Sequence, residues 1–157
     1  MLRQLSRSRF TPSAWAREWV SITELNKARI PRDFVSEREM TIDPVALTAA
    51  YHAAINALDF EMVDGFFAAN VVYHSDGIGS LYGRASVMSS FKSYFERFAD
   101  QTATDEKIEQ MDPRAARAIW TLTATDTSTG EPIQRRGEEI VTFDEAGTII
   151  KVYVVDY

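Results

Sequence analysis

The chain has 157 residues and a formal net charge of −6; 45% of its residues are hydrophobic and 25% are charged. Such a composition is typical of one globular domain with a single core. The acidic balance disfavours nucleic acids and anionic membrane surfaces as partners, because both attract clustered Lys and Arg. The absence of cysteine excludes disulfides, thiolate nucleophiles and cysteine-based metal sites. No apolar run approaches the roughly 20 residues needed to span a bilayer, so we expect a soluble, cytoplasmic protein.

Residues 1–42 are predicted to form an arm in front of the main domain. Thr11 and Pro12 are a helix start signal, and Trp15 and Trp19 follow at a spacing that puts both on one face. We expect this face to pack on its own domain, to contact a second copy of the chain, or to cover a pocket. The arm begins with arginines and serines, so organellar targeting stays open as an alternative to the cytoplasm.

The main domain is predicted over residues 43–157 and begins with helices. Asp43 and Pro44 are a capping residue followed by proline at the first helical position, a combination typical of a helix N-terminus. Asp59 gives the same capping signal to a shorter helix that we expect to end near Asn70. Apolar residues recur at helical spacing in three segments: 44–59, 60–70 and 86–99.

Strands are predicted in the remaining segments of this domain. A short apolar strand begins at Val71 and runs into a cluster of ionisable side chains, which is followed by a glycine-containing loop that ends at Gly83. After the third helix, turn residues divide a period-two alternation into four long strands: Thr102–Met111, Ala115–Thr125, Pro132–Phe143 and Thr148–Tyr157. Because the helices come first and an antiparallel meander comes last, the sequence indicates an α+β fold. We expect the helices to pack on one face of the sheet, with a ligand cavity between the helices and the sheet.

Several segments in this order resemble a known superfamily. They are Ala50-Tyr51, Asn56–Phe60, Phe66–His74, Gly83-Arg84 opening a helix, and Gly137–Asp144 followed by Gly147–Ile150. Together they look like the nuclear transport factor 2-like superfamily, which includes ketosteroid isomerases and SnoaL-like polyketide cyclases. The resemblance implies a cone-shaped α+β barrel, in which three helices pack in a curved antiparallel sheet, and a homodimer formed through the sheet. It leaves the function open, because folds of this kind host enzymes and non-catalytic modules.

The resemblance to ketosteroid isomerases also implies site residues. Tyr51 takes the position of the tyrosine in the first helix, and Glu139 takes that of the late acid that donates to the forming oxyanion. The position of the base falls on Ser75 or His74, according to the alignment, and the only nearby aspartate is Asp76.

Residue chemistry makes His74 and Asp76 candidates as well. An unperturbed imidazole pKa of about 6.5 lets a histidine act as base and then acid near neutrality. Strand alternation puts His74 and Asp76 on one face and Tyr73 and Ser75 on the other. The alternative is a solvent-facing His74 and an Asp76 that serves the turn. We expect His52 to face outward.

Glu139 shares a predicted strand face with Val141, so its carboxyl would be desolvated and could stay protonated as a hydrogen-bond donor. The alternative is a solvated ion pair of Glu138 or Glu139 with Arg135 or Arg136.

A second group of side chains is predicted to line the pocket for an apolar ligand. Tyr51 lies on the apolar stripe of its helix and would otherwise be core. The same alternative applies to the four candidate ligand-binding residues: Tyr73, Phe91, Trp120 and Tyr153.

Two functions follow from these residues. The first is a cofactor-independent acid–base enzyme, of the isomerase, cyclase or dehydratase type, acting on a small apolar carbonyl compound. Two histidines without paired-ligand spacing predict no metal site, and the glycines lack nucleotide-binding spacing, so we expect no cofactor. The second is a non-catalytic module that binds a small hydrophobic molecule or forms a dimer.

Overall fold

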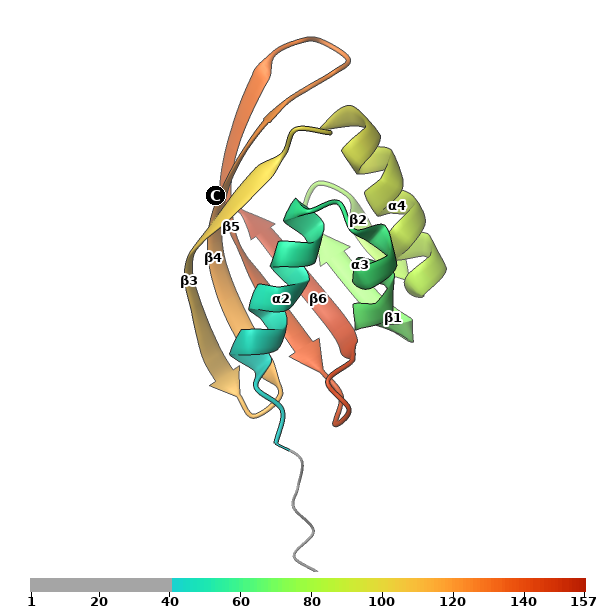
Figure 1. Cartoon of the computed structure of the whole chain (residues 1–157), viewed down its shortest axis with the longest axis vertical. Coiled ribbons are helices and arrows are strands. Elements are labelled where there is room, and N and C mark those ends of the chain that lie inside the picture. Colours follow the sequence, from blue (N-terminus) through green and yellow to red (C-terminus); the bar gives the residue numbers. More distant parts are fainter. Residues whose placement is uncertain (1–40) are drawn as a thin grey trace, which may run out of the picture. The chain divides into compact units, whose positions relative to one another are not determined.

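The computed structural model describes residues 41–157. The predicted helix of the arm, with both tryptophans, lies outside the described residues. The elements in chain order are α2 (Pro44–Asn56), α3 (Phe60–Phe66), β1 (Phe67–Ser75), β2 (Gly79–Tyr82), α4 (Arg84–Arg97), β3 (Thr102–Asp112), β4 (Ala115–Thr125), β5 (Pro132–Phe143) and β6 (Ile149–Asp156) (Figure 1). This arrangement confirms the α+β class and the four-strand meander.

The two predicted helix starts are confirmed by their capping contacts. Asp43 accepts hydrogen bonds of 3.0 Å from the backbone N–H groups of Val45 and Ala46, and Pro44 occupies the first turn of α2. Asp59 accepts a 3.0 Å bond from Met62 N–H at the start of α3. Each cap satisfies N–H groups that a helix leaves without an internal partner.

Two boundaries differ from the prediction. Helix α3 ends at Phe66 rather than near Asn70, because Phe67 already belongs to β1, where it is buried and pairs with Ile149 of β6. The loop predicted after β1 contains strand β2, which pairs with β1 through His74 and Ser80. In both places pairing within the sheet outweighs the local sequence signal.

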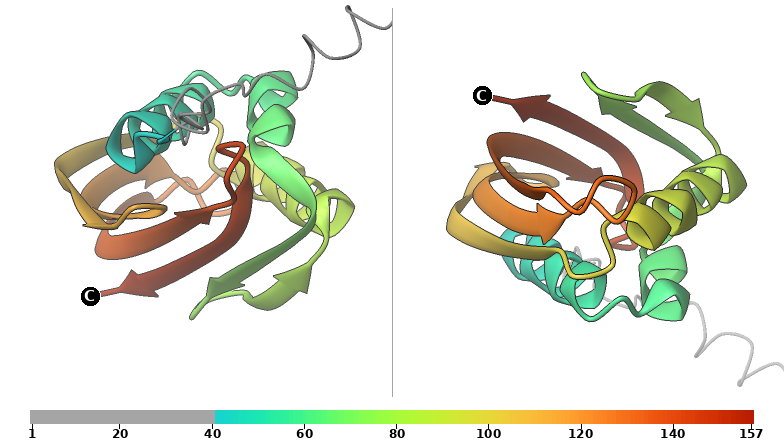
Figure 2. Two further views of the ribbon diagram at one scale, coloured as in Figure 1. Left: turned by 90° about the horizontal axis from the view of Figure 1, so that it is seen from below. Right: turned by 90° about the horizontal axis from the view of Figure 1, so that it is seen from above.

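The six strands form one sheet in the order β2-β1-β6-β5-β4-β3. Neighbours are antiparallel except β1 and β6, which run parallel. The sheet is curved, and the two edge strands, β2 and β3, do not pair, so it does not close into a barrel. Figure 2 shows the three helices on the concave side of this sheet. The core lies there, around buried residues such as Val71, Val141, Phe143 and Val152.

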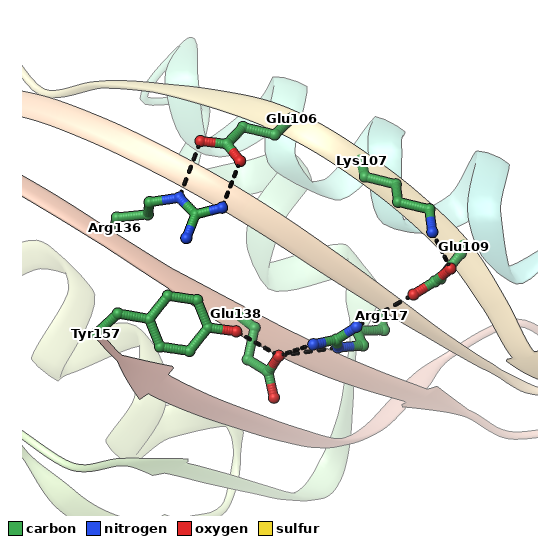
Figure 3. Close-up of polar contacts among 7 residues, drawn as sticks. All are labelled: Glu106, Lys107, Glu109, Arg117, Arg136, Glu138 and Tyr157. Atoms are coloured by element: carbon green, nitrogen blue, oxygen red, sulfur yellow. Dashed lines mark hydrogen bonds and ion pairs between the residues drawn. The ribbon is translucent and has the colours of Figure 1, made fainter.

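The opposite face of the meander is polar. Arg136 of β5 pairs with Glu106 of β3 at 2.8 Å, and Glu138 of β5 pairs with Arg117 of β4 (Figure 3). Tyr157 donates a 2.6 Å hydrogen bond to Glu138. Partly exposed pairs of this kind contribute little stability individually, but they give β5 a charged face directly behind its buried one.

Within residues 41–157, no helix is long and apolar enough to cross a membrane. No group of three or more His, Asp or Glu side chains in the same range has an arrangement suited to a metal ion.

Candidate functional site

A cavity of about 380 Å³ lies between the concave face of the sheet and helices α2 and α4. Most of its wall is apolar, and the apolar side chains that line it include Ile55, Phe91, Phe95, Trp120, Leu122 and Val154. A mostly apolar cavity with a few convergent polar groups is the usual form of a small-molecule site. The polar groups gather in two places on this wall.

The first polar group is centred on His52 of α2. Its Nδ1 atom lies 2.8 Å from Oδ1 of Asp105 on β3, and its Nε2 atom lies 2.7 Å from Oε2 of Glu139 on β5. The side chains of His52 and Glu139 are 12% and 8% exposed, and that of Asp105 is 26% exposed. The imidazole is therefore held between two carboxylates, each from a different strand.

The carboxylates determine the charge of this imidazole. Burial alone would lower the pKa of His52, but the charge of Glu139 and the hydrogen bonds to Asp105 and Glu139 raise it to about 10. His52 is thus an imidazolium at neutral pH. Two carboxylates against one imidazolium leave one net negative charge at this end of the cavity.

Two tyrosines lie in the field of Glu139. Burial, and then the charge of Glu139, raise the phenol pKa of Tyr51 and of Tyr73 well above the usual value. Both hydroxyls therefore stay protonated and remain hydrogen-bond donors. The Tyr51 hydroxyl is buried and has no hydrogen-bond partner among residues 41–157. A buried donor without a partner is uncommon in a folded protein and suggests a functional role.

The second polar group contains Arg135 of β5 and Gln101, which also line the cavity. A guanidinium nitrogen of Arg135 bonds to Oδ2 of Asp156. The Tyr94 hydroxyl donates to Oε1 of Gln101. These contacts use acceptor atoms of Asp156 and Gln101 and leave N–H groups of Arg135 and Gln101 for other partners.

The structure brings together five of the residues predicted for the site. Tyr51, Glu139, Tyr73, Phe91 and Trp120 all line the cavity. Glu139 is buried on the same face as Val141 and Phe143, as expected, whereas Glu138 faces the polar side with Arg117.

Three predicted residues lie elsewhere. His74 and Tyr153 lie on the outer face of β1 and β6, where their rings stack with centroids 5.0 Å apart. Nδ1 of His74 is 2.9 Å from Oγ of Ser80. Asp76 is exposed, and its Oδ1 atom lies 3.9 Å from Nε2 of His74. Strand alternation explains this placement, because Tyr73 and Ser75 take the cavity side of β1.

The prediction that His52 faces outward was wrong. Strand β3 covers the side of α2 next to its apolar stripe, and Asn56 of α2 exchanges hydrogen bonds of 2.8 and 3.0 Å with the backbone of Ala103. Asp105 was also missed. The signal for it would have been its register, since it is the cross-strand partner of Trp120, a predicted pocket residue.

No curated protein matches this chain. One similar solved structure is SalBIII, described as an epoxide hydrolase/cyclase-like enzyme in pyran ring formation in polyether salinomycin. It is 16% identical to this chain, and the two superpose with a TM-score of 0.64 over 71% of this chain and 88% of SalBIII. RV0760c from Mycobacterium tuberculosis, in complex with estradiol-17beta-hemisuccinate, is 20% identical, with a TM-score of 0.62 over 71% and 91%. An NTF2-like protein from Exiguobacterium sp. is 13% identical, with a TM-score of 0.64 over 71% and 98%.

At these identities the three structures share the fold with this chain. The sequence itself matches the SnoaL-like domain over residues 48–152. This range begins in α2, ends in β6 and contains every residue of the His52 cluster. The chain therefore belongs to the SnoaL-like domain family, and it has the fold of NTF2-like proteins, as the sequence predicted.

Proposed function

We propose that this protein is a cofactor-independent acid–base enzyme, of the isomerase, cyclase or dehydratase type, acting on a small and largely apolar carbonyl compound. The observation that carries the proposal is the carboxylate of Glu139, bonded to the His52 imidazolium at 2.7 Å on the wall of an apolar cavity. A carboxylate base beside protonated hydrogen-bond donors can remove a proton from the carbon next to a carbonyl group.

Glu139 is the proposed base. Its Oε2 atom bonds to His52, while no residue in the described range bonds to Oε1, which is free to take a proton. The C–H bond next to the carbonyl breaks, its electron pair forms the enolate, and the proton moves to Glu139. The Tyr51 hydroxyl donates a hydrogen bond to the enolate oxygen. An isomerase returns the proton from Glu139 to another carbon. In a cyclase the enolate carbon attacks a second carbonyl carbon, the π bond of that carbonyl breaks, and its oxygen takes the proton from Glu139.

His52 and Asp105 are proposed as positioning residues. The imidazolium fixes the orientation of Glu139 through its Nε2 contact, and Asp105 holds Nδ1 of the same ring at 2.8 Å. The role of base moves from His74 and Asp76 to Glu139 in this proposal, because those two side chains lie outside the cavity wall.

The family supports a reaction of this class without specifying it. The SnoaL-like match and the relative described as cyclase-like fit proton chemistry without a cofactor. The Mycobacterium tuberculosis relative holds a steroid ester, so a flat apolar ligand is a reasonable first probe for the cavity of this chain.

Hydrogen exchange tests the proposal without knowledge of the natural substrate. The protein is incubated in D₂O with a panel of apolar ketones, including steroid ketones, and deuterium uptake next to the carbonyl is followed by NMR. We expect uptake above the buffer rate and a loss of roughly 10²–10⁴-fold in Glu139→Gln. Glu138→Gln is the matched control, because this neighbouring carboxylate faces the polar side of β5 (Figure 3).

A non-catalytic ligand-binding module is the second candidate. It is favoured by the fact that the charged side chains on the cavity wall are already paired, His52 with two carboxylates and Arg135 with Asp156. Ketones that bind in the cavity without any exchange above buffer would support the module and contradict the enzyme.

A further inference from the structure

We propose that Ser80, His74 and Asp76 form a second reactive site, the hairpin site, at which Ser80 is acylated by activated esters such as aryl esters of short carboxylic acids. The three residues belong to the hairpin of β1 and β2. None of them is part of the cavity wall. The hairpin site is therefore independent of the proton chemistry proposed for Glu139.

The first observation is a contact between a hydroxyl group and an imidazole. Oγ of Ser80 lies 2.9 Å from Nδ1 of His74. The two residues are directly opposite in the antiparallel pair of β1 and β2, where side chains on one face come close together. Ser80 is exposed, so a molecule in solution can reach its hydroxyl. A hydroxyl within hydrogen-bond reach of a base is the arrangement of an activated nucleophile.

Two neighbours orient the imidazole of His74. The ring of Tyr153 stacks on it, with centroids 5.0 Å apart and an interplanar angle of 8°. Oδ1 of Asp76 lies 3.9 Å from Nε2. A carboxylate on this side favours the tautomer with the proton on Nε2, so Nδ1 carries the lone pair and accepts the hydrogen bond from Ser80. His74 is thus placed as the base, and Asp76 is a positioning residue.

The backbone of β2 supplies a donor for the oxyanion. Gly83 N–H donates a 2.8 Å hydrogen bond to the carbonyl oxygen of Val71, and bonded and non-bonded pairs alternate along an antiparallel ladder. Three residues further along β1, His74 and Ser80 are therefore a non-bonded pair. The N–H of Ser80 points away from β1, and β2 is an edge strand of the described sheet. This N–H can therefore donate to a developing oxyanion.

The proposed reaction is an acyl transfer. The Ser80 oxygen attacks the ester carbonyl carbon, its proton moves to Nδ1 of His74, and the π electron pair of the carbonyl moves to oxygen. The carbonyl re-forms, the bond to the phenol oxygen breaks, and the leaving phenolate takes the proton from His74. Water then attacks the acyl carbon in the same way. Its proton passes through His74 to the departing Ser80 oxygen, and the carboxylic acid is released.

The surroundings of Ser80 favour activated aryl esters. One N–H donor stabilises an oxyanion less than a pair of donors does, so the reaction needs a good leaving group. Tyr82 lies two residues from Ser80 on the same face of β2 and is 70% exposed. Its ring can contact an aromatic leaving group.

The test uses p-nitrophenyl acetate with the full chain. Release of p-nitrophenolate is followed by absorbance, and the acetylated residue is identified by peptide mass spectrometry. We expect hydrolysis above the buffer rate and an acetyl group on Ser80. Ser80→Ala should reduce the rate to that of the buffer, and His74→Gln should lower the acylation rate by roughly 10²-fold, the lower end of the contribution of a positioned base. Ser89→Ala changes another exposed serine, on α4, and should keep the rate.

The role of Asp76 is tested by separating kcat from KM. Asp76→Asn should lower kcat by about three- to fivefold, as for an exposed charge pair, and leave KM unchanged. Asp76→Glu should recover part of the loss. A raised KM with unchanged kcat would contradict a positioning role.

Three results would overturn the inference: no hydrolysis above the buffer rate by the unchanged protein, acetylation confined to lysine or tyrosine side chains, or full activity in Ser80→Ala. Urea unfolding of each variant shows that the fold is retained. Deuterium exchange next to ketones reports on the cavity, so Ser80→Ala should keep it. Failure of the hairpin site and failure of the proposed enzyme are therefore distinguishable.

Discussion

His52 and Glu139 are 87 residues apart in the chain, yet Nε2 of the first lies 2.7 Å from Oε2 of the second. This contact joins helix α2 to the central region of the sheet. Because Asp105 holds the other side of the ring at 2.8 Å, the imidazolium connects α2 to β3 and β5 together. The contact is therefore both part of the proposed site and part of the tertiary structure, and its two contributions can be measured separately.

The charge of His52 should make stability depend on pH. Its pKa rises from the usual 6.5 to about 10 on folding, so the folded protein binds this proton more tightly than the unfolded chain. The stabilisation is complete below about pH 6.5 and is lost as the pH rises through about 10. We expect the difference in unfolding free energy between the unchanged protein and His52→Gln to shrink steadily over this interval in urea titrations. A difference independent of pH would contradict a raised pKa.

Removal of the imidazole should be costly. His52→Ala leaves the carboxylates of Asp105 and Glu139 facing each other at the cavity wall, and breaking a buried ion pair in this way costs about 3 kcal/mol. Denaturant unfolding at pH 7 measures the loss. His52→Ala combined with Glu139→Gln removes one of the opposed charges and should recover part of it. No recovery in the double variant would mean that packing, rather than charge, accounts for the effect.

Tyr51→Phe should separate stability from activity. The hydroxyl is buried without a partner in the described residues, so its removal should leave the unfolding free energy unchanged or raise it by up to about 1 kcal/mol. If the hydroxyl donates to the enolate oxygen, the exchange rate should fall by about 10²–10³-fold. The two measurements are thermal unfolding and deuterium uptake. A large loss of stability with unchanged uptake would assign the hydroxyl to the core.

Gly137→Ala should destabilise the sheet. The added methyl group would lie 2.3 Å from the backbone oxygen of Val155 and 2.7 Å from the Trp120 ring. The backbone atom cannot move aside cheaply, so we expect a loss of about 1–3 kcal/mol. Gly77→Ala is the comparison, because a Cβ atom at this turn meets nothing within 4 Å. Equal stability of the two variants in urea would contradict the close packing at Gly137.

Substitutions of His74 on β1 and of Asp76 just after it should leave the proposed reaction unchanged. His74→Ala and Asp76→Ala change side chains that lie away from the cavity wall. Deuterium exchange should therefore stay within about twofold of the unchanged protein, well below the effect of a positioned base. Loss of exchange in either variant would return the role of base to β1 and remove it from Glu139.

Local signals in the sequence were sufficient for most of the fold. The caps at Asp43 and Asp59 and the turns of the meander each depend on a few neighbouring residues, and the structure has all of them. The end of α3 and the existence of β2 could not be predicted in this way. Both depend on pairing with β1 or β6, and β6 lies at the far end of the sequence.

The candidate site could be predicted only in part. Alternation along β5 grouped Glu139 with buried residues, and alternation along β1 separated Tyr73 from His74, although it could not tell which of the two faced inward. The environment of His52 depends on how closely β3 crosses α2. The position of Asp105 depends on the register of β3, which shifts directly after this residue. Neither quantity is encoded by a local pattern.

The segment Arg135–Glu139 contains two arginines, one glycine and two glutamates, so its charges are almost symmetrical with respect to the two faces of the sheet. A shift of β5 by one residue would turn Arg136 and Glu138 inward in place of Arg135 and Glu139, so this face would still carry one arginine and one glutamate, but two residues apart instead of four. It would also place a long charged side chain beneath Trp120, where even a methyl group collides with the backbone of Val155. The formal charge of this segment's inward face is thus the same in both registers, whereas steric exclusion at Gly137 allows only the observed one.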